Sequence, residues 1–168
     1  MTQQQMTQQQ MTQQQMTQQQ TADEFLIWLK GQIPLINHMG FGDLVYDGQS
    51  LQMPAKLAPN VNDKGTGFGG SLSTVATLCG WALVTLYLRE KGRDCDVMIR
   101  DSQINYLAPI TDDFYAEATL PDETELTTFM SFLDNKGRGR LNLEIEVKQG
   151  DQVAMTLKGA YVAVERQR

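Results

Sequence analysis

The longest apolar stretch of the chain runs from Ser71 to Leu88 and contains no charged residue. Apolar side chains recur there at helical spacing, and others fill the remaining faces, so the pattern predicts a helix buried on nearly all sides. The apolar positions are Leu72, Val75, Ala76, Leu78, Cys79, Trp81, Ala82, Leu83, Val84 and Leu86. Such a helix would be about 27 Å long. Its serine and threonine residues, and the lack of flanking basic residues on one side, argue against a membrane span.

Shorter elements precede this helix. Asp23 can cap a short amphipathic helix that ends near Gly31. Two strands are predicted over residues 41–46 and 50–55, because an Asp-Gly pair between them favours a hairpin turn.

We expect the long helix to end at Lys91 and Gly92. After it in the sequence, the apolar pattern changes to a period of two. This period predicts strands over residues 96–107, 114–120, 140–147 and 153–164, whereas the segment 121–134 has no clear pattern. One long helix cannot supply the crossovers of a parallel sheet. The sequence therefore predicts an α+β fold in which a mainly antiparallel sheet curls around that helix.

The first 20 residues are four copies of Met-Thr-Gln-Gln-Gln. Methionine at every fifth position does not return to one helix face, and the uncharged, Gln-rich composition predicts a disordered or weakly helical tail. We therefore divide the chain into this tail, residues 1–20, and a single domain, residues 21–168, that is long enough to bury a core. No apolar segment follows a basic one at the N-terminus, so we expect no secretory signal.

Charge and composition narrow the function. A net charge of −6 argues against nonspecific binding to nucleic acid. Cys79 and Cys95 show no paired spacing, and we expect both to be reduced thiols in a cytoplasmic protein. The only histidine is His38, which excludes a histidine-rich metal site and leaves little room for a histidine-dependent nucleophile, unless His38 itself serves. We expect no metal.

A glycine-rich loop leads into the long helix. Gly65, Gly67 and Gly70 satisfy the pattern G-x-G-x-x-G, but no strand precedes them and no Gly-Lys-Ser/Thr follows, which argues against a dinucleotide site or a P-loop. The glycines instead leave the amides of residues 68–71 bare at the positive end of a buried helix dipole. Such amides can hold an oxyanion, and Asn60 and Asn62 add side-chain donors nearby.

The loop and helix of residues 59–84, followed by Ile-Asn-Tyr-Leu-Ala-Pro-Ile at residues 104–110, resemble the hotdog fold. More narrowly, they resemble the putative thioesterase family named after the C-terminal domain of YiiD, over residues 21–164. The resemblance implies a long helix wrapped by an antiparallel sheet, a homodimer that extends the sheet across its interface, and an acyl-thioester site at that interface. Whether dimers pair into tetramers stays open. The substrate would carry its own phosphopantetheine arm, from acyl carrier protein or coenzyme A, so no separate cofactor is expected.

The chain departs from better-known hotdog hydrolases of the phenylacetyl-CoA thioesterase type. Asn62 and Gly70 match their pattern, but Phe68 stands where they carry a histidine and Thr77 where they carry the catalytic carboxylate. A threonine cannot act as a general base near neutral pH. The usual means of activating water is therefore missing.

Decarboxylation of a malonyl thioester needs no base, and members of the YiiD-related family are known as malonyl-acyl-carrier-protein decarboxylases, which initiate fatty-acid synthesis. The resemblance therefore implies a decarboxylase, with Asn62 and the amides of Gly69 and Gly70 as the catalytic groups. The predicted substrate-binding residues are Asn60, Phe68, Ser71, Thr77 and Tyr106.

Two alternatives stay open. One is a thioester hydrolase in which Asp63 or a carboxylate of a partner subunit positions water, and the other is a non-catalytic acyl-thioester binder. Two basic clusters can be solvated faces or contacts for an acidic carrier protein. They consist of Arg89, Lys91 and Arg93, and of Lys136, Arg138 and Arg140.

Overall fold

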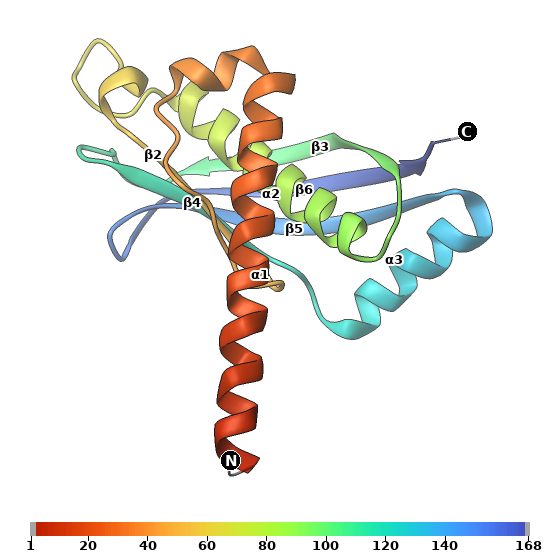
Figure 1. The fold of residues 1–168 in the computed structure, drawn as a ribbon. Coiled ribbons are helices and arrows are strands. Elements are labelled where there is room, and N and C mark those ends of the chain that lie inside the picture. Colours follow the sequence, from red (N-terminus) through yellow and green to blue (C-terminus); the bar gives the residue numbers. More distant parts are fainter. Residues whose placement is uncertain (1–2, 167–168) are drawn as a thin grey trace.

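The computed structural model of the chain describes residues 3–166 and shows a six-stranded antiparallel sheet curled around one long helix (Figure 1). The strands lie in the order β1-β2-β4-β5-β6-β3. The helices are α1 (Gln3–Gln32), α2 (Gly69–Glu90) and α3 (Glu123–Lys136), with short 3-10 turns at η1 (Pro34–His38) and η2 (Ala58–Asn60). The strands are β1 (Val45–Tyr46), β2 (Ser50–Ala55), β3 (Cys95–Tyr106), β4 (Phe114–Thr119), β5 (Arg138–Gln149) and β6 (Gln152–Glu165). The predicted fold class is confirmed.

The central helix lies where the apolar pattern placed it. α2 runs from Gly69 to Glu90, and Gly92 follows it with a φ of 69°, the left-handed conformation that glycine adopts readily beyond a helix end. α2 is long and apolar enough to span a membrane by those measures alone, but most of it is buried inside the fold, as expected for a core helix.

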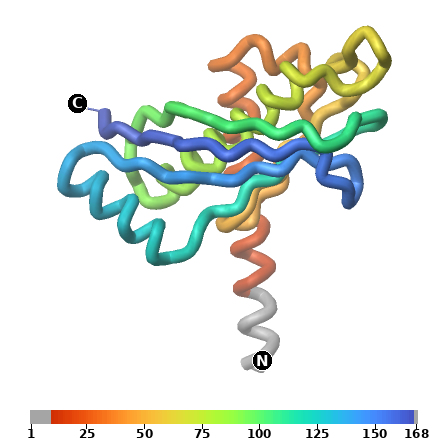
Figure 2. Tube along the Cα trace, turned by 180° about the vertical axis from the view of Figure 1, so that it is seen from behind, coloured from red at the N-terminus to blue at the C-terminus, as the bar shows by residue number. Residues whose placement is uncertain are grey.

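The strands of the sheet are not paired equally along their lengths. β5 and β6 pair along their full lengths, whereas β4 pairs with β5 only over residues 115–118 and 145–148. The rest of β5, residues 138–144, has α3 beside it in place of a strand. β3 forms one edge of the sheet, with a bulge between Ile99 and Asp101. Figure 2 shows β3, β6 and β5 from the side opposite α2, which we call the outer face.

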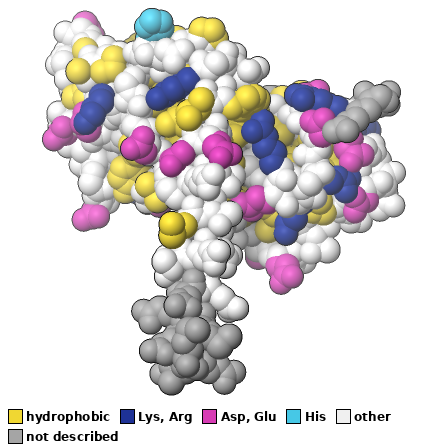
Figure 3. All heavy atoms as spheres, in the orientation of Figure 1, with side chains coloured by type: hydrophobic (Ala, Val, Ile, Leu, Met, Phe, Trp, Pro, Cys, Tyr) yellow, Lys and Arg dark blue, Asp and Glu magenta, His cyan; other side chains and the backbone are white. Residues whose placement is uncertain are grey.

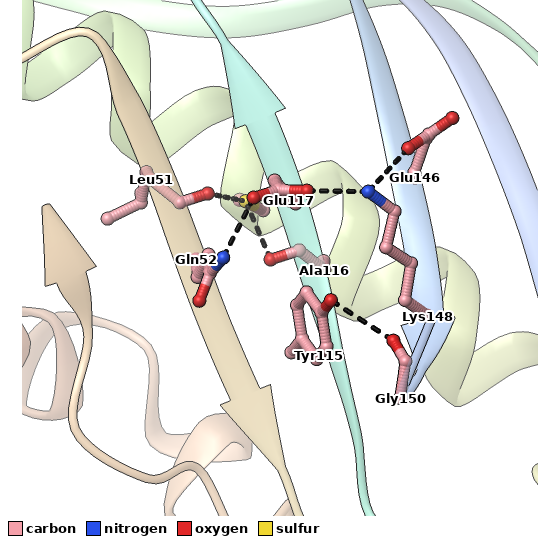
Figure 4. A network of polar contacts seen from close by, with 9 residues as sticks. Leu51, Gln52, Tyr115, Ala116, Glu117, Glu146, Lys148 and Gly150 are labelled. Atoms are coloured by element: carbon pink, nitrogen blue, oxygen red, sulfur yellow. Dashed lines mark hydrogen bonds and ion pairs between the residues drawn. The ribbon is translucent and has the colours of Figure 1, made fainter. Parts of the chain in front are cut away.

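The alternation predicted for the late strands is confirmed. Leu141, Leu143, Ile145 and Val147 are buried, and their neighbours lie on the outer face. Part of that face carries a polar network (Figure 4). There Glu117 of β4 accepts hydrogen bonds from Gln52 of β2 at 2.8 Å and from Lys148 of β5 at 2.6 Å, so that one carboxylate ties three strands together.

The structure adds one helix to the predicted elements and corrects two of them. The segment 121–134 contains α3, which Asp122 caps by accepting a hydrogen bond from the Glu125 amide at 2.9 Å. The predicted strand 41–46 is reduced to β1, and Phe41 makes only an isolated bridge with Ala55. Asp23 does not cap a helix, because α1 is already helical from Gln3.

The repeats themselves therefore continue into the first domain helix, where a disordered or weakly helical tail was expected. α1 projects away from the sheet at its N-terminal end (Figure 1). The end of the last repeat touches the domain, because the Gln19 side chain donates to the Leu44 carbonyl oxygen at 2.9 Å. The division into a tail and a domain stays a prediction, which truncation can test.

Candidate active site at the start of the central helix

Three backbone amides at the start of α2 are left unpaired. Phe68 is the N-cap residue, with extended backbone and no side-chain capping bond. The Phe68 amide donates to the Asn60 carbonyl oxygen at 2.7 Å, and the Leu72 amide donates to the Phe68 carbonyl oxygen at 3.0 Å. Between them, the N–H groups of residues 69, 70 and 71 have no hydrogen-bond partner within residues 3–166. They lie at the positive end of a 22-residue helix, which suits them to a negatively charged oxygen.

Aromatic rings pack closely on this helix start, and two glycines leave room for them. A β-carbon on Gly69 would lie 3.2 Å from the ring of Tyr106, and the Tyr106 hydroxyl donates to the Gly69 carbonyl oxygen at 2.9 Å. A β-carbon on Gly70 would lie 2.5 Å from the ring of Phe68. The two rings therefore flank the free amides, and the two glycines allow that approach.

A groove of about 520 Å³ opens at the same place. One wall is the glycine-rich helix start with Leu72, and the other is the segment 106–110 that follows β3. The Gly67 amide donates to the Ile110 carbonyl oxygen at 2.8 Å, which holds the two walls together. Among the described residues, no Asp, Glu, His, Lys or Arg lines this groove. The polar groups at the groove are the free backbone amides and the Tyr106 hydroxyl.

Asn62 holds its own loop closed. Its Nδ2 donates to the Thr66 Oγ1 at 2.9 Å, and its Oδ1 accepts from the amides of Lys64 at 2.8 Å and Thr66 at 3.2 Å. The side chain is half-buried and is not part of the groove wall. The second N–H of Nδ2 makes a weaker contact, with Nδ2 3.5 Å from the Gly67 carbonyl oxygen. A direct role for Asn62 in oxyanion binding stays a prediction, and it would use this second N–H.

Asn60 is buried beneath the loop. Its Nδ2 donates to the carbonyl oxygens of Met39 at 2.8 Å and Lys56 at 2.7 Å, while its Oδ1 has no partner among the described residues. Its backbone carbonyl oxygen accepts a hydrogen bond from the Phe68 amide. Asn60 therefore supports the entry of the chain into α2 from below, and it too lies outside the groove wall.

The other predicted site residues are divided between the groove and its surroundings. Phe68 is 54% exposed and covers Gly70, and Ser71 supplies one of the three free amides. Thr77 lies two turns further along α2, outside the groove wall, and its carbonyl oxygen accepts from the Tyr161 hydroxyl at 3.2 Å. Asp63 is exposed in the loop, and His38 is exposed at the end of η1 (Figure 3). Neither lines the groove.

One groove residue and one residue of the adjoining loop were not predicted from the sequence. Ile110, fully buried, anchors the loop to the second wall, and Thr66 is the partner of Asn62. The motif Ile-Asn-Tyr-Leu-Ala-Pro-Ile contains Ile110, whose contact to the loop is made by its backbone oxygen and leaves no side-chain signal in the sequence. In the part of the chain that the structure describes, no three His, Cys, Asp or Glu side chains lie close enough together to hold a metal ion.

Buried thiol and phenol groups near α2 serve packing. Burial raises the pKa of the Cys79 thiol, which lies against the carbonyl oxygens of Leu51 at 3.4 Å and Ala116 at 3.5 Å. Burial also raises the pKa of the Tyr161 hydroxyl. Both groups stay protonated at neutral pH, so neither supplies a nucleophile or a base.

A helix wrapped by a curled antiparallel sheet, with free amides at the helix start, defines the hotdog class of proteins that act on acyl thioesters. The sequence matches the profile of the YiiD C-terminal family, described as a putative thioesterase, over residues 22–165. The chain belongs to this family.

Solved structures agree with that assignment. A protein of unknown function from Chlorobaculum tepidum is 28% identical, with a TM-score of 0.82 over 89% of this chain and 97% of its own. A structure described as a putative thioesterase from Shewanella oneidensis is also 28% identical, with a TM-score of 0.78 over 86% of this chain and 98% of its own. The phenylacetic acid degradation protein of Thermus thermophilus, at 14% identity and a TM-score of 0.54 over 80% of this chain and all of its own, shares the fold.

Proposed function

We propose that the chain binds an acyl thioester with its carbonyl oxygen on the free amides of residues 69–71 and decarboxylates a malonyl group. The three unpaired N–H groups beside the 520 Å³ groove carry this proposal. Donors fixed by the fold need no rearrangement when negative charge develops on the thioester oxygen. Each well-placed donor stabilises the transition state by about 3 kcal/mol.

The reaction asks for no base. The bond between the carboxylate carbon and the α-carbon breaks, its electron pair forms an enolate whose charge rests on the thioester oxygen, and CO₂ leaves. A proton from water then completes the acetyl thioester. The groove supports this route because its described lining offers amides and apolar walls and no ionisable side chain apart from Tyr106. An apolar wall also favours loss of a carboxylate, since it removes water from that group.

Thioester hydrolysis is the second candidate, and the family description supports it. The same amides would hold the oxyanion of the tetrahedral intermediate. The attacking water would need a base that is not part of the groove wall, such as Asp63 after a loop movement or a carboxylate of a partner subunit. A binder without catalysis would use the same groove.

We also propose that a second copy of the chain pairs along β3. This strand is an edge of the sheet, and Met98, Tyr106 and Leu107 are exposed on it or just beyond it. An unpaired edge of this length is a ready template for another strand. Because Tyr106 also touches Gly69, such pairing would bring the partner close to the groove. Acyl carrier protein and coenzyme A are the proposed carriers of the substrate, in the cytoplasm.

The test is intact-mass analysis of malonyl-carrier protein after incubation with the enzyme. Loss of one CO₂ supports decarboxylation, and appearance of the free carrier thiol means hydrolysis. An unchanged mass favours the binder or another acyl group.

A matched pair of variants isolates the amide. Gly69→Pro removes the N–H at the first helical position, where proline is tolerated, and Gly69→Ala keeps that N–H while adding the same β-carbon. The extended backbone of Phe68 (ψ 124°) suits a following proline. We expect Gly69→Pro to be roughly a hundredfold slower than Gly69→Ala. Equal rates would remove the Gly69 amide from the mechanism.

A further inference from the structure

A second groove, of about 680 Å³, lies on the opposite side of the sheet from the active-site groove, between α3 and the outer face of β5. It exists because β4 pairs with only part of β5, and α3 takes the place of a strand along the remaining edge. Gly139 allows this packing, since a β-carbon there would lie 2.8 Å from both the ring and the backbone oxygen of Phe129. The packing of α3 against β5 therefore depends on glycine at this position.

The rim of this groove is strongly basic in an acidic protein. Arg100 of β3, Lys136 at the end of α3, and Arg138 and Arg140 of β5 all line it, and Glu125 is the one acidic residue in its described lining. The whole chain carries a net charge of −6. Four positively charged side chains from three elements therefore lie together, although the chain as a whole is negatively charged.

Much of this positive charge is not neutralised by the protein. Asp101 lies 3.8 Å from Arg100 and 3.9 Å from Arg140, the outer limit of an ion pair. Within the described residues, Lys136 and Arg138 have no ion pair, and Lys136 lies over the Phe132 ring at 4.7 Å. Guanidinium groups match the geometry of carboxylate and phosphate oxygens. The rim is suited to an anionic group.

The floor of the groove is apolar. Phe132 is 47% exposed, and the half-buried Val162 of β6 lines the groove beside it. The volume lies within the roughly 300–1,000 Å³ typical of small-molecule sites. Apolar surface next to unpaired cations fits a ligand that carries both an alkyl chain and an anion.

A second copy of the chain is a poorer occupant. Two-fold pairing of this face would bring the same patch of each copy together, and so set cations against cations. A protein partner would need an interface of about 1,000 Å² or more, whereas the exposed apolar residues close to the groove are few, chiefly Phe132 and Met98.

We propose that this outer groove binds an anionic amphiphile with a single alkyl chain. Its carboxylate or phosphate head lies among Lys136, Arg138 and Arg140, and its chain lies on Phe132 and Val162. The site is separate from the active-site groove, and the proposal does not rest on the proposed reaction.

Isothermal titration calorimetry of the full chain tests this site. The probes are decanoate and decyl phosphate, which distinguish a carboxylate from a phosphate head, and decyltrimethylammonium, which has the same chain with the opposite charge. Inorganic phosphate tests the head alone. We expect one site that binds at least one of the two anions about tenfold or more tightly than the cation or inorganic phosphate.

Variants locate the site. The double variant Lys136→Glu/Arg138→Glu and the single variant Phe132→Ser should each weaken anion binding about tenfold or more. Lys158→Glu is the matched control, because Lys158 lies on β6 outside the groove and pairs with Glu144 at 3.5 Å. It should leave affinity unchanged. Arg138→Gln removes one charge without reversing it and should also weaken anion binding. Circular dichroism of each variant shows whether a loss of binding is accompanied by a loss of folding.

Several results would overturn the proposal. Binding of the cationic amphiphile as tight as that of the anions would exclude head recognition. Affinity insensitive to both groove variants would place the ligand elsewhere, and no heat with either anion would reject the site. If sedimentation shows that the charge-reversed variant changes the oligomeric state, the groove is an interface between copies.

Discussion

The ring of Tyr161 occupies the space in which a β-carbon on Gly80 would stand, with its Cζ 2.5 Å from that point. The Tyr161 hydroxyl donates to the Thr77 carbonyl oxygen of the same helix at 3.2 Å. β6 therefore inserts its largest fully buried side chain into a notch on α2. The sheet and the central helix fit together at this pair.

Gly80→Ala should lower the free energy of unfolding by about 1–3 kcal/mol, because the added methyl group overpacks a core without space. Helix propensity alone gives the opposite sign, since alanine is about 1 kcal/mol better than glycine inside a helix. The control is Gly31→Ala in α1, where a β-carbon would meet nothing within 4 Å. Chemical denaturation should show loss at residue 80 and no loss at residue 31. Equal effects would mean that Tyr161 moves aside freely.

Thr66→Val should reduce activity less than Asn62→Ala, because it removes only the bond to Nδ2 of Asn62, whereas Asn62→Ala also removes the two bonds that Oδ1 accepts in the loop before α2. The double variant should be no slower than Asn62→Ala, since Thr66→Val acts on an interaction that Asn62→Ala has already removed. If Nδ2 of Asn62 instead contacts the substrate oxyanion, Asn62→Ala alone should cost roughly a hundredfold or more in kcat. Steady-state kinetics of the four proteins distinguishes the two roles.

Gln19→Ala should destabilise the domain by about 1 kcal/mol, because its side chain bridges α1 to the Leu44 carbonyl oxygen. Gln20→Ala is the control, since Gln20 bonds only Glu24 on the same helix. Removal of residues 1–15 should leave the thermal midpoint unchanged. A clear fall in the midpoint on that truncation would show that the earlier repeats also support the domain.

Glu117→Gln should cost about 1 kcal/mol at neutral pH. The hydrogen bond from Lys148, and then that from Gln52, hold the pKa of the Glu117 carboxyl below its usual range. A carboxyl with a lowered folded-state pKa stabilises the protein above its unfolded pKa of about 4.3, and this stability is lost as pH falls through the folded value. The difference between wild type and Glu117→Gln should therefore shrink below about pH 4.

The control for this pH profile is Glu144→Gln. Glu144 pairs with Lys158 at 3.5 Å, and both side chains are more than half exposed. Exposed pairs of this kind contribute little, so we expect no measurable loss at any pH. A loss for Glu117→Gln that stays constant across the acid range would mean that the carboxylate charge is not what stabilises the strands.

The sequence contained the signal for one element that was not predicted. Asp122 caps α3, and Leu126, Phe129, Met130 and Leu133 follow at helical spacing. Phe129 and Leu133 are the buried positions of that helix. The apolar stripe of α3 is short and flanked by polar residues, so the pattern alone does not distinguish a helix from a loop there. The strand predicted over residues 41–46 failed for a different reason, because pairing with β2 reaches only Val45 and Tyr46.

By itself, the sequence determined the central helix, the alternating strands and the placement of glycines at the helix start. These features depend on neighbours within one or two turns, which a linear pattern records. Only the tertiary structure decided where the side chains of the site point. Tyr106 reaches Gly69 across 37 residues of chain, and Asn62 turns its amide to Thr66. Such orientations depend on which distant atoms fill the space and satisfy the hydrogen bonds, and that is settled when the sheet closes around α2.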